Sequence, residues 1–157
     1  MKETRAFTTG SADETRSLGE TLGGMLEAGD VVLLSGELGA GKTVFVKGMA
    51  AGVGYDGPVS SKSFVLLGEY DGRVKLYHAD LYRLDEPEMV EDLALDELVE
   101  EGVVAVEWPE RADAYLPEDG LLIRFEIEGE ERRTLALAPV GERAESLAAR
   151  FEKAVRG

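Results

Sequence analysis

The 157-residue sequence predicts a single α/β domain, residues 1–157, in which helices flank a mixed sheet with a largely parallel core and β-hairpin extensions. Two short, continuous apolar runs, Val31–Ser35 and Val103–Val106, are typical of parallel strands buried on both faces. Asp71-Gly72 separates two β-rich runs, Phe64–Tyr70 and Arg73–Ala79, and is a strong hairpin signal. Strands of this kind between helical patterns indicate the α/β class.

Helical patterns begin near the N-terminus. Ser11-Ala-Asp-Glu14 has the form of a capping box and predicts a helix that starts there. The apolar residues that follow lie on one face, and Gly29 is expected to end the helix. Three glycines inside this helix should weaken it: Gly19, Gly23 and Gly24.

The second half of the chain predicts two more helices and another hairpin. Glu88–Glu101 is expected to be helical, with Gly102 as its stop. Leu121–Glu128 alternates between apolar and polar residues and should pair with Arg132–Ala138 across Gly129. A C-terminal helix should bury one apolar face, formed by Ala144, Leu147, Ala148, Phe151 and Val155.

Composition favours a cytoplasmic protein that does not bind nucleic acid directly. No apolar run is long enough to span a membrane, the N-terminus has no signal-peptide pattern, and cysteine is absent. The net charge is −15, with 32 acidic against 17 basic residues. Because direct binding to nucleic acid requires positive charge against the phosphates, this balance opposes it. Binding to RNA through a partner stays open.

The segment Gly36-Glu-Leu-Gly-Ala-Gly-Lys-Thr43 matches the complete P-loop pattern and precedes an expected helix from Lys42 to about Ala51. Glycines let backbone N–H groups wrap around phosphates, and the N-terminus of the helix favours anions. Lys42 can reach the β- and γ-phosphates of ATP, and the Thr43 hydroxyl can bind Mg²⁺. An accidental glycine-rich turn is the alternative, which the position between a buried strand and a helix disfavours. The expected nucleotide-binding residues are Gly36, Glu37, Leu38, Gly39, Ala40, Gly41, Lys42, Thr43 and Val44.

Two acidic residues, Asp80 and Glu107, end strand-like segments. Each could bind the metal ion or orient the attacking water. The residue pattern does not assign the two roles, and a solvated carboxylate is the alternative for each. GTPases orient the attacking water with a Gln side chain. Because this chain has no Gln, Glu107 is favoured as the residue that takes this role. The chain also has no Asn, so it lacks the Asn-Lys-x-Asp motif that recognises guanine, which favours ATP.

Two residues near Asp80 have open interpretations. His78, the only histidine, is expected to pack or hydrogen bond inside the fold, with a role in the site as the alternative. Arg83 could pair with an acidic residue or could contact the nucleotide or a partner.

Taken together, these motifs resemble the TsaE (YjeE) family, the ATPase subunit of the bacterial machinery that makes threonylcarbamoyladenosine in tRNA. The P-loop is common to many families, but three further segments follow it in the family's order. Val59-Ser-Ser-Lys-Ser-Phe64 is similar to its first switch loop, although Lys62 stands where the family usually has proline. His78-Ala-Asp-Leu-Tyr-Arg-Leu84 is similar to its Asp-x-Tyr-Arg segment, and Val106-Glu-Trp-Pro-Glu110 to its Glu-Trp switch.

The resemblance implies roles for four residues of these segments. Asp80 would serve Mg²⁺, Glu107 would be the catalytic base, and Trp108 would lie on the nucleotide side. Ser63 would present its hydroxyl to the γ-phosphate or the metal. The implied partners are TsaB and TsaD, with tRNA contacted only through that complex.

The function predicted from these observations is ATP hydrolysis that powers or resets a tRNA-modifying complex. A small-molecule P-loop kinase is the first alternative, but the sequence has no long arginine-rich insertion that would form a lid. The second alternative is a docking module that binds ATP without hydrolysing it.

Overall fold

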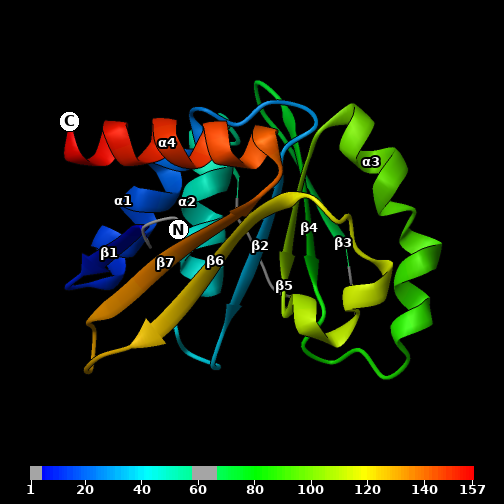
Figure 1. Cartoon of the computed structure of the whole chain (residues 1–157), viewed down its shortest axis with the longest axis horizontal. Coiled ribbons are helices and arrows are strands. Elements are labelled where there is room, and N and C mark those ends of the chain that lie inside the picture. Colours follow the sequence, from blue (N-terminus) through cyan, green and yellow to red (C-terminus); the bar gives the residue numbers. More distant parts are fainter. Residues whose placement is uncertain (1–4, 58–66) are drawn as a thin grey trace.

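The computed structural model describes residues 5–57 and 67–157, in which helices flank one seven-stranded sheet (Figure 1). In the described ranges, no helix is both long enough and apolar enough to cross a membrane. The first half of the chain contains β1 (Arg5–Thr9), α1 (Ala12–Gly23), β2 (Val31–Gly36), α2 (Lys42–Gly52), β3 (Leu67–Asp71) and β4 (Lys75–Asp80). The second half contains the 3-10 helix η1 (Pro87–Leu93), α3 (Leu95–Glu101), β5 (Val103–Glu107), two 3-10 turns (η2, Pro109–Arg111; η3, Asp113–Tyr115), β6 (Gly120–Ile127), β7 (Arg133–Val140) and α4 (Glu142–Arg156).

The sheet has the strand order β1-β7-β6-β2-β5-β4-β3. Its four central strands are parallel: β2 pairs with both β5 and β6, and β4 pairs with β5. The outer pairs β3–β4, β6–β7 and β1–β7 are antiparallel. This arrangement confirms the expected mixed sheet with a parallel core, and both expected hairpins are present. The carboxyl ends of the parallel strands therefore meet at one edge of the sheet, which is where ligands bind in open α/β folds.

The expected single helix over Glu88–Glu101 is wrong. The structure has the 3-10 helix η1, then Ala94 in the left-handed conformation with φ 52°, and only then α3. Val90 and Leu95 are both buried in the same cluster, but five residues along a continuous α-helix they would point in different directions. The break at Ala94 allows both to reach the core. Gly102 stops α3 as expected, and its N–H donates to the Leu98 carbonyl.

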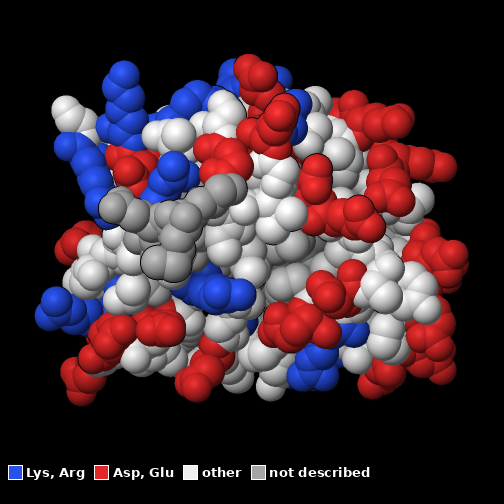
Figure 2. Space-filling view, in the orientation of Figure 1, with Lys and Arg blue, Asp and Glu red and all other residues white. Residues whose placement is uncertain are grey.

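Acidic side chains gather on the side of the molecule where α3 lies (Figure 2). The segment Asp85–Glu101, which contains η1 and α3, has nine acidic residues and no Lys or Arg. This surface repels polyanions, so any attraction for phosphate must come from groups gathered locally at one site.

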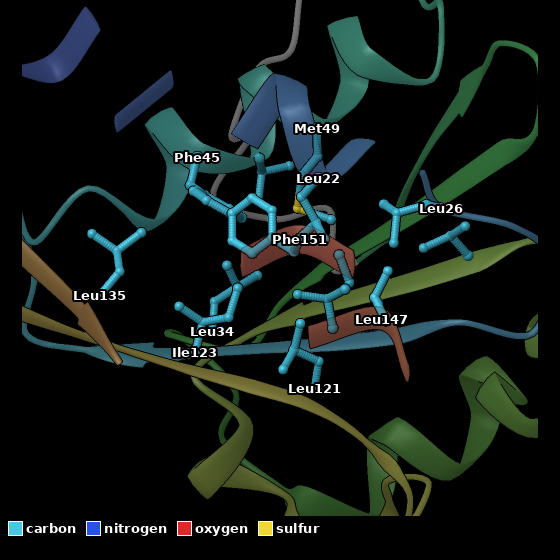
Figure 3. Close-up of a cluster of buried hydrophobic side chains, with 14 of the residues drawn as sticks. Leu22, Leu26, Leu34, Phe45, Met49, Leu121, Ile123, Leu135, Leu147 and Phe151 are labelled. Carbon is cyan, nitrogen blue, oxygen red and sulfur yellow. The ribbon is translucent and has the colours of Figure 1, made fainter. Parts of the chain in front are cut away.

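Helices cover the two faces of the sheet unequally. The larger core lies between the sheet and α1, α2 and α4, where side chains from all three helices converge on β2 and β6 (Figure 3). Alternate residues of β5 face the other side and pack against η1 and α3. The expected face of α4 is confirmed, with Leu147, Ala148 and Phe151 fully buried and Val155 packed at the margin. The parallel strands are thus buried on both faces, as their continuous apolar runs predicted.

The first helix begins as expected but ends earlier. The Ser11 hydroxyl accepts the N–H of Glu14 at 3.2 Å, and the Glu14 carboxylate accepts the N–H of Gly10 at 3.2 Å. The helix then ends at Gly23, not at Gly29, because the chain turns tightly after Gly24. Gly29, with φ 103°, instead forms the bend that leads into β2.

Glycines in α1 and α2 allow these two helices to come unusually close. A Cβ atom on Gly48 would lie 2.0 Å from the Arg16 carbonyl oxygen, and one on Gly19 would lie 2.2 Å from the Phe45 carbonyl oxygen. Gly23 and Gly52 make equivalent approaches further along the same helices. The glycines that were expected only to weaken α1 therefore set its contact with α2, the helix that follows the P-loop.

Candidate functional site

The P-loop connects the end of β2 to the start of α2, as the sequence predicted. Backbone φ is 147° at Gly36, 83° at Gly39 and 102° at Gly41. Residues with a Cβ atom rarely adopt this backbone conformation. A Cβ atom on Gly36 would also lie 2.6 Å from the Phe125 carbonyl oxygen. These three residues thus give the loop a backbone conformation that depends on glycine.

Lys42, the first residue of α2, is buried in the site, with 4% of its surface exposed. Its ammonium donates a hydrogen bond to the Gly36 carbonyl and lies 3.4 Å from the centroid of the Trp108 ring. Burial lowers the pKa of Lys42, and the nearby carboxylates of Glu107, Glu110 and Asp80 oppose that shift. The site therefore holds a buried ammonium group among carboxylates, where it could bind a phosphate ligand.

Glu107, at the end of β5, connects the P-loop helix to the neighbouring strand β4. The Thr43 hydroxyl lies 3.1 Å and 3.3 Å from its two carboxylate oxygens, and donates to them. On the other side, His78 Nε2 lies 2.6 Å from Glu107 Oε2. Because only 2% of Glu107 is exposed, these two contacts determine where its carboxylate points.

Asp80 lies directly beside Glu107 at the same edge of the sheet. The two residues are register partners in the parallel β4–β5 pair. The Asp80 carboxylate accepts the N–H of Tyr82 at 3.1 Å, which orients it as the chain leaves β4. Both acidic residues that the sequence singled out therefore flank the start of α2.

Trp108 has a strained backbone that turns its ring toward the P-loop. Its φ of 60° and ψ of 49° place it in the left-handed region, where a bulky residue is rare and signals a local constraint. Its N–H donates to the Leu34 carbonyl at 3.1 Å, and its ring stacks obliquely on Tyr82 with centroids 5.0 Å apart. The ring therefore forms one wall around the Lys42 ammonium.

The structure brings together five of the predicted site residues: Lys42, Thr43, Asp80, Glu107 and Trp108. Leu38 lies on the rim of the loop with 66% of its surface exposed, Glu37 and Gly39 are also exposed, and Val44 is half-buried. Arg83 is exposed. The predicted switch loop, including Lys62 and Ser63, lies outside the described residues.

Two contacts at the site were not expected from the sequence. His78 is buried and hydrogen bonds inside the fold, as expected, but its spacing gave no sign that its partner would be Glu107. Arg133, at the start of β7, donates to the P-loop carbonyl of Gly39 at 3.1 Å, although 94 residues separate the two. A hydroxyl or carboxylate at a strand end can be found by pattern, but neither of these contacts has a local signal.

The residues at this edge have the chemistry to hold Mg²⁺ together with phosphate oxygens. Among the residues that the structure describes, no three acidic or histidine side chains form a metal site by themselves. Mg²⁺ commonly takes one or two protein carboxylates and completes its coordination with water and phosphate oxygens. Thr43, Asp80 and Glu107 supply oxygen ligands of this kind beside the P-loop, so a metal bound together with a nucleotide suits the site.

The chain is similar to known proteins over most of its length. A family model described as "Threonylcarbamoyl adenosine biosynthesis protein TsaE" matches residues 9–135. The tRNA threonylcarbamoyladenosine biosynthesis protein TsaE of Bacillus subtilis is 38% identical over 149 residues, which cover 94% of this chain and 92% of the relative. The protein of the same name from Treponema pallidum is 42% identical over 129 residues, which cover 82% and 96%. The crystal structure of Bacillus subtilis YdiB superposes with a TM-score of 0.81 at 34% identity, over 98% of this chain and 97% of that one.

Proposed function

The chain belongs to the TsaE family of tRNA threonylcarbamoyladenosine biosynthesis proteins, and from this premise we propose that it binds and hydrolyses ATP for that modification. The observation that carries the proposal is the contact of Glu107 with Thr43, because it joins an acidic strand end to the P-loop hydroxyl. ATP is favoured over GTP by the absence of Asn, which the guanine-recognition motif requires.

The P-loop would hold the triphosphate of ATP through its backbone N–H groups and Lys42. The positive φ values of Gly36, Gly39 and Gly41 support this role, since they turn the backbone toward a ligand. When ATP arrives, the Lys42 ammonium can exchange its contact with the Gly36 carbonyl for phosphate oxygens, which carry more charge.

Thr43 and Asp80 would hold Mg²⁺, which when bound neutralises charge on the β- and γ-phosphates. The Thr43 hydroxyl can offer a lone pair to the metal while its proton still reaches Glu107. Glu107 would accept a proton from the attacking water or orient that water, as a general base does. The competing assignment makes Glu107 the metal ligand and Asp80 a structural residue, and the register pairing of the two keeps both within the site.

The proposed partners are TsaB and TsaD, with tRNA reached only through that complex. A net charge of −15 and the acidic segment Asp85–Glu101 support an indirect route, since both oppose direct contact with RNA. The carboxyl ends of the parallel strands carry the acidic groups proposed for ATP hydrolysis. This is what a subunit would need if it uses ATP hydrolysis to drive a partner protein.

The test is an ATPase assay of the chain alone and with TsaB–TsaD, each with and without tRNA. We expect slow hydrolysis alone and faster hydrolysis in the complex, with phosphate released to water. Tight ATP binding without turnover in any mixture would favour a docking module. Transfer of the phosphoryl group to a small acceptor would favour a kinase.

A further inference from the structure

The tip of the P-loop is held by an arginine from the β6–β7 hairpin. Arg133 begins β7, opposite Ile127 at the end of β6. One terminal nitrogen of its guanidinium, Nη1, donates to the carbonyls of Gly129 and Arg132, both at 2.9 Å. The other, Nη2, donates to the Glu130 carbonyl at 3.2 Å and to the Gly39 carbonyl in the P-loop at 3.1 Å. The side chain thus ties the hairpin turn to the phosphate loop.

The loop is packed where it leaves β2, whereas its tip at Leu38 and Gly39 is exposed. Gly36 pairs with Phe125 in the β2–β6 ladder, and the Phe125 ring meets Phe45 of α2 edge-to-face with centroids 5.5 Å apart. At the tip, Leu38 is 66% exposed, and among the described residues no heavy atom would lie within 4 Å of a Cβ atom placed on Gly39. Packing by the described residues therefore does little to order Leu38 and Gly39, although the next residue, Ala40, is completely buried.

We propose that Arg133 is a positioning residue for the P-loop, which it holds in the phosphate-binding shape by tethering the Gly39 carbonyl to the β6–β7 turn. Glycines give the loop its unusual φ values but also give it many other conformations. A guanidinium has a rigid, planar set of donors, so several hydrogen bonds to fixed carbonyls restrict the loop at low entropic cost. Arg133 acts on the loop backbone through Gly39 and is not assigned to the phosphate itself.

The first test measures loop order in the protein without nucleotide, so it does not depend on ATP binding. The Ala40 N–H donates to the Glu37 carbonyl at 3.0 Å inside the loop, and its hydrogen exchange reports whether the loop keeps its shape. We expect Arg133→Ala to speed this exchange about tenfold, a loss typical of a charge-assisted hydrogen bond. Arg132→Ala is the matched control, because it removes the same charge from the same turn and should leave exchange unchanged.

The second test rests on the proposed function and measures ATP affinity and turnover separately. Arg133→Ala should raise the Kd for ATP about five- to tenfold, while hydrolysis at saturating ATP stays within about twofold of the unchanged protein. Arg133→Lys, which keeps the charge but lacks the planar set of donors, should also weaken binding, and it serves as the variant if Arg133→Ala does not fold.

Three outcomes would overturn the proposal: unchanged exchange in Arg133→Ala, equal acceleration in Arg132→Ala, or full rescue of both readouts by Arg133→Lys. Failure of the unchanged protein to bind ATP would contradict the proposed function alone, because the exchange measurement would still decide whether Arg133 orders the loop.

Discussion

His78 Nε2 lies 2.6 Å from Glu107 Oε2, in a part of the sheet where both side chains are almost completely buried. The contact joins β4 to β5 and leaves the Glu107 carboxylate between a histidine ring and the Thr43 hydroxyl. With the proton on Nε2, the ring donates to the carboxylate and holds it toward the P-loop. A single buried acid is thus oriented by groups from β4 and α2.

His78→Ala should slow the proposed ATP hydrolysis about tenfold, measured with the proposed partners TsaB and TsaD, because Glu107 loses a donor that orients it. ATP affinity, measured by calorimetry, should change by less than about threefold, since His78 contacts Glu107 and is not assigned to the nucleotide. His78→Gln retains an N–H donor and should recover part of the rate. Equal losses of affinity and rate, with no recovery in the Gln variant, would show that His78 only supports packing.

Glu107→Gln should retain ATP binding and reduce single-turnover hydrolysis by about 10² to 10⁴, the usual contribution of a general base. Glu97→Gln, an exposed acidic residue on α3, is the control for loss of one negative charge and should be unaffected. If the Glu107 variant instead loses Mg²⁺-dependent affinity and keeps its chemistry at saturating ATP, then Glu107 is the metal ligand and the competing assignment is correct.

Thr43→Ala and Asp80→Ala should each raise the Mg²⁺ concentration needed for half-maximal ATP hydrolysis, because each removes an oxygen ligand from the proposed metal site. Titration of Mg²⁺ at fixed ATP measures this. Binding of ATP without metal should be affected less than binding with metal. Normal Mg²⁺ dependence in both variants would mean that the metal assignment is wrong.

Lys42→Met should abolish measurable ATP binding and yet stabilise the fold by about 0.5–2 kcal/mol near neutral pH, because an active-site cation is replaced by an apolar side chain. Burial lowers the pKa of Lys42, so the unfolded chain binds this proton more tightly than the folded one. The cost of the charge is therefore complete below the folded pKa and disappears as pH rises from there toward the unfolded value.

Urea unfolding of the unchanged protein and of Lys42→Met, at pH 7 and at pH 10, measures the difference in their free energies of unfolding. The stability advantage of Lys42→Met should shrink at the higher pH. An advantage that grows with pH would contradict the argument, as would a Lys42→Met protein that binds ATP normally.

Gly48→Ala should destabilise the protein by about 2–4 kcal/mol, because the new Cβ atom would lie 2.0 Å from the Arg16 carbonyl oxygen and force α1 and α2 apart. Gly24→Ala is the matched control: among the described residues, its Cβ atom would have no neighbour closer than 3.6 Å, and its φ is −65°. That substitution should be neutral or slightly stabilising. Thermal unfolding of the two variants decides between them, and similar losses would argue against the close helix contact.

Local spacing was sufficient to predict most of the elements. The P-loop pattern, the Asp71-Gly72 hairpin and the Ser11 cap each depend on residues only a few positions apart, and the structure has all three elements. The family is also confirmed, since its model matches residues 9–135 and the relative from Bacillus subtilis is 38% identical over 149 residues. The roles of Asp80 and Glu107 stay predictions, although the structure brings both to the predicted edge.

The class of fold, the glycine-rich loop and the strand ends that carry acids are therefore predictable from local patterns, because periodicity and turn chemistry act over short stretches of chain. Which distant groups meet is not predictable in this way and is seen only in the folded structure. Glu107 contacts Thr43 across 64 positions and Arg133 contacts Gly39 across 94. The break at Ala94 likewise follows from the need of Val90 and Leu95 to reach one core. Such contacts depend on strand order and on the packing of whole elements, which no local pattern specifies.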